Sequence, residues 1–297
     1  MHKIPAGLIA AAALVSGDMA IAQERVIDAD NPVIEFTVDG ETAALEVTPD
    51  GAGSPVFSAA LAKRLGLKGS MLVGVHMVGV TKVTAESNLV RIDLGDGKAK
   101  KRRAFFFDTD EWHHRGEGSL GPSALPDDVI TFRLRAPQEG EREITLPLVE
   151  HKRAGFYTRF QVGEKYIPTF ISFARPETMA NASAGAILAQ AFGARMEGES
   201  REMHIELGIH RPVRDLVVPE GLMLGELPVK DIVVRSQDTG STAAIPDEES
   251  DPNEIVVTGG KMEIAPRLWI GTASLEKCST LRFDRPAEVI RLSCKFD

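Results

Sequence analysis

Two stretches far apart in this chain follow the same order of elements, and this internal repeat restricts the possible folds more than any other feature. The first, Phe36–Leu67, reads FTVDGETAALEVTPDGAGSPVFSAALAKRLGL, and the second, Phe160–Ala194, reads FQVGEKYIPTFISFARPETMANASAGAILAQAFGA. Each predicts a strand, a turn with glycine, a second strand, an irregular loop and a helix. The chain is therefore expected to hold two copies of one unit.

The later parts of the two units also match. The segment GSLGPSALPDDVITFRL (Gly118–Leu134) is similar to LWIGTASLEKCSTLRFD (Leu268–Asp284), since each has Gly-x-x-x-Leu followed by a strand with phenylalanine. The polar and turn-rich stretch Ala136–Glu143 lies between the copies. We therefore predict one unit over residues 23–140 and a second over residues 141–297.

Short β-type runs bounded by turn residues, such as VIEFTVDG and LVRIDLGDG, dominate both units. Helical patterns are few. The clearest are rich in alanine and leucine and cover Ser58–Leu65 and Ala182–Phe192. The sequence thus predicts an all-β protein with short helices.

The first residues have the features of a secretory signal peptide. His2 and Lys3 form a cationic start, an apolar run extends from Ile4 to Val15, and Ala20-Ile21-Ala22 is a small-x-small cleavage pattern. The apolar run is too short to span a bilayer, although an uncleaved anchor is the alternative. We expect residues 1–22 to be removed after Ala22 and the rest to be secreted, or periplasmic in a Gram-negative bacterium.

The charge balance argues against binding to nucleic acid. The 297 residues carry a formal net charge of −9 at pH 7, whereas nucleic-acid-binding domains show a basic patch or stripe. The only dense basic run, Lys98–Arg103, follows a Gly-Asp-Gly turn and precedes an apolar strand. We interpret it as the solvated end of a hairpin.

The two cysteines, Cys278 and Cys294, both lie near the C-terminus. An even pair in an exported protein predicts a disulfide, which would tie the last strand to its hairpin partner. Two buried free thiols are the alternative.

Taken together, the order strand, loop, helix and then Gly-x-Leu-Gly-Pro-x-x-Leu-Pro resembles the retropepsin-like and pepsin-like aspartic proteases. GSLGPSALPDDVITF, at the end of the first unit, is the most specific part of this resemblance, which covers nearly the whole mature chain. The resemblance implies two pseudo-symmetric β-barrel lobes with a cleft between them. It also implies an Asp-Thr-Gly loop in each lobe and a hairpin flap over a bound peptide.

The chemistry of that family depends on two carboxylates that share one proton, because two carboxylates held close together cannot both ionise. Counted back from its helix, the first unit has Pro49 at the expected aspartate position and Asp50 at the threonine position. Counted from Gly163, the second unit has Ser172 at the expected aspartate position. In this alignment both catalytic acids are absent.

A second alignment, which matches the helices without gaps, sets Pro49-Asp50 against Pro176-Glu177. It leaves open a pair of acids, Asp50 and Glu177, with Arg175 next to the second one. Arg175 would favour the ionised form and so make a shared proton harder to hold.

Three other motifs resemble functional sites. Gln237–Ser241 contains a literal Asp-Thr-Gly-Ser, but no helix pattern follows it, and we interpret Asp238 as a surface turn residue. His113 and His114 lack a third ligand at metal spacing, so no metal site and no cofactor are predicted. Leu72–Val80, with His76, occupies the place of the flap; a buried hairpin is the alternative.

An acidic, proline-bounded insertion is predicted at about residues 241–260. Within it, NEIVVTGG resembles the TonB-box-like segment of outer-membrane receptors, so Glu254–Gly259 could contact an envelope partner. A short strand in the insertion is the alternative.

Our main functional prediction is an exported aspartic-protease-like protein that has lost the catalytic pair and binds a peptide or protein segment in its cleft. The alternative is a divergent aspartic-type endopeptidase that uses Asp50 and Glu177. A structural envelope protein without a ligand is the third possibility.

Overall fold

The computed structural model describes residues 23–109, 111–238, 241–247 and 265–296. The predicted signal peptide, most of the predicted insertion and the TonB-box-like segment lie outside these ranges. The described chain is mostly β with few short helices, which confirms the predicted class.

The first half contains nine strands, one α-helix and one 3-10 helix within its described residues. In chain order these elements are β1 (Glu24–Asp28), β2 (Val33–Val38), β3 (Glu41–Val47), β4 (Val56–Phe57), α1 (Ala59–Arg64), β5 (Gly74–Val78), β6 (Thr81–Asp93), β7 (Lys100–Phe106), β8 (Gly118–Leu120), η1 (Pro122–Ala124) and β9 (Val129–Arg133).

The second half continues with longer hairpins and a longer helix. Its elements are β10 (Arg142–Pro147), β11 (Val149–His151), β12 (Gly155–Val162), β13 (Lys165–Ile171), β14 (Thr178–Ala180), α2 (Ala182–Phe192), β15 (Arg195–Glu206), β16 (Ile209–Val217), β17 (Leu222–Leu224), β18 (Leu227–Val229), β19 (Ile232–Arg235), β20 (Leu268–Ile270), η2 (Thr272–Leu275), β21 (Cys278–Asp284) and β22 (Val289–Cys294).

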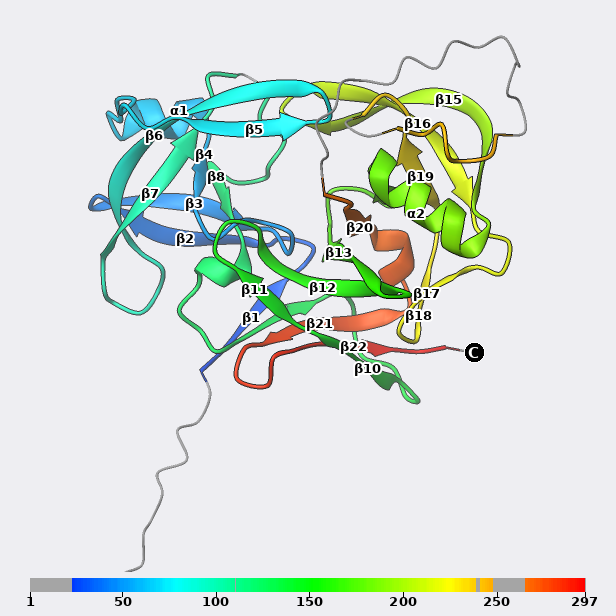
Figure 1. Cartoon of the computed structure of the whole chain (residues 1–297). Coiled ribbons are helices and arrows are strands. Elements are labelled where there is room, and N and C mark those ends of the chain that lie inside the picture. The colour runs from blue at the N-terminus through cyan, green and yellow to red at the C-terminus, as the bar shows by residue number, and fades with distance from the viewer. Residues whose placement is uncertain (1–22, 110, 239–240, 248–264, 297) are drawn as a thin grey trace, which may run out of the picture.

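The two halves share one connectivity. In the first, β3 pairs in parallel with β8, which pairs antiparallel with β4, and β4 in turn pairs in parallel with β7. In the second, β13, β20, β14 and β19 pair in the same way. The hairpins β5–β6 and β15–β16 occupy the far edges of the two sheets. The repeat in the sequence is thus matched by a repeat in the strand pairing (Figure 1).

The predicted helices α1 and α2 form where the sequence places them. Ser58 precedes α1 and its Oγ accepts a hydrogen bond from Leu61 N at 3.1 Å. Asn181 precedes α2 and its Oδ1 accepts from Ala184 N at 2.9 Å. Such caps satisfy backbone N–H groups at a helix start that have no partner within the helix.

A third sheet joins the halves, in the order β1-β9-β21-β22-β10. It lies below both sheets in Figure 1. Its buried phenylalanines come from both halves, since Phe132 of β9 contacts Phe283 of β21 with ring centroids 6.2 Å apart. The guanidinium of Arg285 adds four hydrogen bonds to carbonyls of residues 122–127. The halves are therefore joined by shared strands, a shared core and backbone contacts.

No helix among the described residues has both the length and the hydrophobicity needed to cross a membrane.

The predicted disulfide between Cys278 and Cys294 is present and connects β21 to β22. Both cysteines are buried, at 1% and 0% exposure. Closing a loop of this size removes conformational entropy from the unfolded chain. The bond therefore stabilises the sheet that both halves share.

We expect the double variant Cys278→Ala/Cys294→Ala to unfold with a free energy lower by about 3 kcal/mol, which is typical for a loop of this length. Urea unfolding followed by tryptophan fluorescence measures the change. Reductant serves as the control, because it should destabilise the wild type and leave the variant unchanged. Equal stability of variant and wild type would show that the bond contributes nothing.

Candidate functional site

Two equivalent loops follow β3 and β13, and we call them the first central loop (residues 48–55) and the second central loop (residues 172–177). Each begins with a hydrogen bond to the late strand beside it: Thr48 N donates to Leu120 O at 3.0 Å, and Ser172 N donates to Ile270 O at 2.9 Å. Each ends at the short strand before a helix. The sequence predicts these two loops as the places of the degenerate catalytic residues.

The strand pairing makes Thr48, and not Pro49, the structural equivalent of Ser172. Val47 pairs with Leu120 as Ile171 pairs with Ile270, so the next residue in each chain segment is equivalent. Between equivalent positions the first half has one more residue, because Thr48 lies eight positions before Val56 in β4, whereas Ser172 lies seven before the equivalent Met179 in β14. The alignment based on Gly163 was therefore shifted by one residue at the strand.

The ungapped alignment of the helices is also shifted. Helix α1 has 6 residues and α2 has 11, while their capping residues Ser58 and Asn181 are equivalent. Matching the helix ends therefore displaces the loops by about one helical turn. As a result, Asp50 lies early in its loop, whereas Glu177 lies at the end of the other loop, next to β14.

A glycine holds each central loop by a close backbone contact. A Cβ atom on Gly121 would lie 1.8 Å from Gly51 O, and one on Gly271 would lie 2.2 Å from Pro176 O. Both glycines have ordinary backbone angles, with φ of −86° and −81°. Space, and not backbone strain, is therefore the reason for glycine at these positions.

Asp50 lies where the two central loops meet. Burial raises the pKa of its carboxyl group, and the negative charge of Glu206 adds to this rise. A hydrogen bond from Ser172 and the positive charge of Arg175 act in the opposite direction without cancelling it. The groups that act on Asp50 across the centre are therefore a hydroxyl, a cation and a carboxylate from the second half.

Ser172 is buried, at 3% exposure. Its Oγ accepts a hydrogen bond from Ala174 N at 3.3 Å, which leaves the hydroxyl proton available for Asp50. The structure thus brings together Asp50 and Ser172, two of the residues singled out from the sequence. Glu177 does not join them: its negative charge raises the pKa of Arg175, and its side chain lines a pocket described below.

Arg175 is held in place by two contacts of its guanidinium. It donates to Ile205 O at 2.8 Å and to Met179 Sδ at 3.0 Å. Burial lowers the pKa of this group, although the negative charges of Asp50 and Glu206 oppose that effect. Arg175 therefore supplies a fixed positive charge between the two carboxylates.

The hairpins β5–β6 and β15–β16 meet above the central loops. His76 of β5 bonds through Nε2 to Glu206 Oε1 of β15 at 2.5 Å, with 43% and 47% of the two side chains exposed. Burial alone would lower the pKa of His76, but the bond and charge of Glu206 raise it overall. Burial would likewise raise the pKa of Glu206, but His76 and Arg175 lower it overall. His76 and Glu206 therefore form a charged pair that is partly exposed to solvent.

A second contact between the hairpins involves Arg211 of β16. Its guanidinium donates to Val78 O at 3.0 Å and also contacts Thr81 Oγ1. At the tip of the first hairpin, Gly79 has φ of 61°, and a Cβ there would approach Arg211 and Asp238 at 2.9 Å each. The tip of the β5–β6 hairpin therefore packs closely against Arg211 of the β15–β16 hairpin.

Asp238, interpreted from the sequence as a surface turn residue, is in fact buried at 4% exposure. It forms an ion pair with Arg235 at 2.7 Å, and Arg235 lies over the ring of Trp269. The surface interpretation was wrong because Asp-Thr-Gly-Ser has turn composition, and composition does not report the buried cation nearby.

Three histidine rings lie close together, one before β8 and two on the β15–β16 hairpin. His113 lies 4.2 Å from His204, and His204 lies 5.3 Å from His210, measured between ring centroids. Burial lowers the pKa of His204, and the charges of His113 and His210 lower it further. The rings meet edge to face, with interplanar angles of 68° and 63°. Among the described residues, no three potential metal ligands come together.

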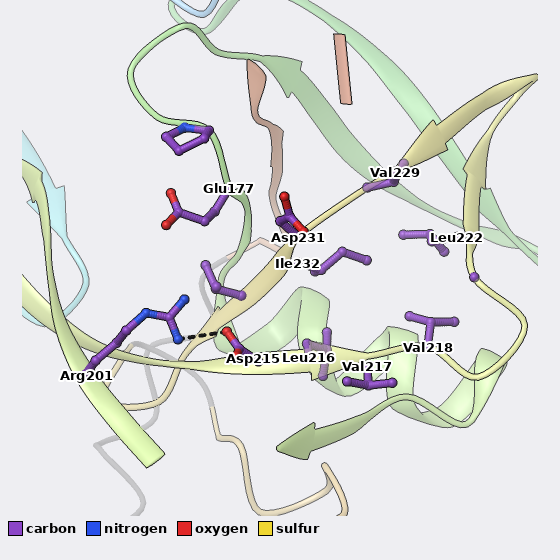
Figure 2. Close-up of a pocket in the computed structure, with 13 residues that line it drawn as sticks. Glu177, Arg201, Asp215, Leu216, Val217, Val218, Leu222, Val229, Asp231 and Ile232 are labelled. Carbon is purple, nitrogen blue, oxygen red and sulfur yellow. Dashed lines mark hydrogen bonds and ion pairs between the residues drawn. The ribbon is translucent and has the colours of Figure 1, made fainter. Parts of the chain in front are cut away.

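A pocket of about 550 Å³ lies beside the second central loop (Figure 2). Its walls come from the end of that loop, the β15–β16 hairpin, β17, β18 and the start of β19. It is lined by Pro176, Glu177, Arg201, Asp215, Leu216, Val217, Val218, Gly221, Leu222, Val229, Asp231, Ile232 and Val233.

Sequence reasoning missed the roles of Glu206 and Arg211, because nothing in a single strand indicates contact with another hairpin. It also missed this pocket, whose lining is scattered over more than 50 positions of the chain. In comparisons with known proteins, no family model matches this sequence, and no curated protein matches it.

We expect Gly121→Ala to displace the first central loop and to lower the melting temperature by several degrees, because the added methyl overlaps a carbonyl oxygen. Gly53→Ala in the same loop is the matched control, since its Cβ would meet no atom closer than 3.3 Å. Differential scanning calorimetry compares them. If both variants melt alike, the close contact does not position the loop.

We expect the pKa of His76, measured by NMR titration of its ring, to lie above 6.5 in the wild type and below 6.5 in Glu206→Gln. Because the pKa is raised, the stability from this pair is present in full below pH 6.5 and is lost as pH rises through the raised value. Because the pKa of Glu206 is lowered, its contribution to stability is present in full above pH 4.5 and is lost as the pH falls through the lowered value.

The control for this titration is Glu86→Gln, which removes a charge from the same hairpin away from His76. It should leave the His76 titration unchanged. A His76 pKa that ignores the Glu206 substitution would show that the bond between the hairpins does not form in solution.

Proposed function

We propose that this chain is an exported, aspartic-protease-like binding protein that holds an extended peptide or protein segment between its central loops and its two hairpins. The family assignment is supported by the shared connectivity of the halves, in which a late strand lies between the strands before and after each central loop. The disulfide is in keeping with export, because such bonds persist in oxidising compartments.

The observation that carries the proposal is the partner of Asp50. An aspartic protease needs a second carboxyl group to share a proton with the first, so that one activates water and the other polarises the substrate carbonyl. The side chain that acts on Asp50 from the equivalent loop is instead the hydroxyl of Ser172, which lowers the pKa of Asp50. A serine hydroxyl can donate to a carboxylate but cannot take its place as an acid at these pH values.

Edge strands offer a way to bind an extended segment. Strand β5 is the last strand of its sheet, and β15 is the last strand of the other. An edge strand has unpaired backbone groups that can add another strand. Large apolar side chains on and beside β5 are exposed, including Leu72 at 60% and Val75 at 54%, and can contact alternate side chains of such a segment.

The alternative function is a divergent endopeptidase that uses Asp50 with Glu177. The raised pKa of Asp50 favours it, because a carboxyl group that keeps its proton can act as a general acid. The position of Glu177 at the other end of its loop, beside the pocket, weighs against it.

We expect the mature protein to select peptides from a phage-displayed decapeptide library and to leave them uncleaved between about pH 3 and pH 7. Ala174→Trp, which fills the space next to Ser172 with an indole, should weaken binding of the selected peptides by at least about ten-fold. Ala60→Trp is the matched control, since Ala60 is also an exposed alanine and lies on α1.

Cleavage of the selected peptides that is abolished by Asp50→Asn would overturn the binding proposal in favour of the endopeptidase. Selected peptides that bind Ala174→Trp as well as wild type would show that binding takes place elsewhere on the molecule. Mass spectrometry reports cleavage, and fluorescence polarisation reports affinity.

A further inference from the structure

The pocket beside the second central loop has a charged end and an apolar end. Figure 2 shows Glu177, Arg201 and Asp215 on one side, and Val218, Leu222 and Val229 on the other. Asp231 lies between them near Ile232. A pocket divided in this way fits a ligand that has a charged head and an aliphatic part.

The charged end has an excess of carboxylates. Arg201 is the one cation in the lining, and its guanidinium is bound to Asp215 at 2.7 Å. Within the described residues, the carboxylates of Glu177 and Asp231 form no ion pair and no hydrogen bond with another side chain, although Arg175 lies within electrostatic reach of Glu177. The charge that would complete this end is therefore positive.

The apolar end is well formed. Leu222 of β17 and Val229 of β18 face each other in the strand pairing, and both are buried, at 3% and 8% exposure. Leu216 and Ile232 add further buried aliphatic surface, at 3% and 8%. Each methylene that a ligand places against such surface is removed from water, which favours binding.

We propose that this pocket binds an alkylammonium group, with the ammonium between Glu177 and Asp231 and the carbon chain against Leu222 and Val229. An ammonium is a compact charge with three donors, so it can bind carboxylates that come from different elements. A free alkylamine and the side chain of lysine share this chemistry.

The lysine form of the proposal rests on the proposed function, because Glu177 ends the loop that begins at Ser172. A segment bound beside Ser172 would need to extend only along that loop to place a lysine in the pocket. The pocket then selects which segments bind.

The test uses NMR of the full mature protein with methyl groups labelled, titrated with n-pentylamine. We expect the methyl signals of Leu222, Val229 and Ile232 to shift, with a dissociation constant of about millimolar order for so small a ligand. Pentanol and pentanoate, which have the same carbon chain, should bind at least about ten-fold more weakly. Lengthening the amine from propyl to pentyl should strengthen binding by up to about four-fold per methylene.

Conservative variants separate charge from folding. Glu177→Gln/Asp231→Asn should weaken pentylamine about ten-fold; asparagine suits position 231, where φ is 48°. Arg201→Gln should strengthen pentylamine, because it frees the carboxylate of Asp215. Glu226→Gln, which removes an exposed carboxylate outside the lining, should change nothing.

Three results would overturn the proposal: unshifted methyl signals, equal binding of pentanol or pentanoate, or unchanged affinity in the double variant. A peptide arm compares selected peptides that contain lysine with the same peptides containing norleucine. If pentylamine binds but no peptide does, the pocket proposal stands and the proposed function is wrong. Equal binding of lysine and norleucine peptides keeps the function and rejects the pocket as its specificity site.

Discussion

The centre of this molecule depends on a close contact between backbones, made twice. Gly121 and Gly271 each follow a late strand and lie against carbonyl oxygens of the central loop in the same half, with no room for a side chain. Hydrogen bonds from Thr48 and Ser172 to the same late strands fix the start of each loop. Because both halves use this arrangement and share a sheet, the two loops meet, and Asp50 faces Ser172.

The two carboxyl groups near the centre, Asp50 and Glu206, have pKa values shifted in opposite directions. Burial raises the pKa of Asp50, whereas the bond to His76 and the charge of Arg175 outweigh burial and lower that of Glu206. One carboxyl group therefore tends to keep its proton, and the other tends to lose it. Sharing a proton requires direct contact between the two carboxyl groups, and the carboxyl group of Glu206 is bound to His76 instead. Under the proposed function, Asp50, Ser172 and Arg175 would contact the polar backbone of a bound segment.

Much of the fold could be predicted from the sequence, because the repeat, the helix starts and the cysteine pair are local patterns. The alignment of the loops could not, since one extra residue before β4 and a longer α2 shift the two halves in opposite ways. The burial of Asp238 was missed for a related reason: its partner Arg235 is close in sequence, but the Trp269 ring that covers Arg235 comes from β20. The candidate site is formed by contacts between the two halves, and the sequence of a single segment does not indicate such contacts.

The contacts that hold the two hairpins over the centre respond to acid in opposite directions. Protonation of His76 strengthens its bond to Glu206, because the raised pKa of His76 reflects that bond. Burial and the charges of His113, His210 and Arg175 lower the pKa of His204, and Glu111 opposes them, so acid weakens the contact between the histidine rings. Arg211 holds the tip of the first hairpin through its hydrogen bond to Val78 O. Acid therefore favours the contact of His76 with Glu206 and disfavours the contact of His204 with His113.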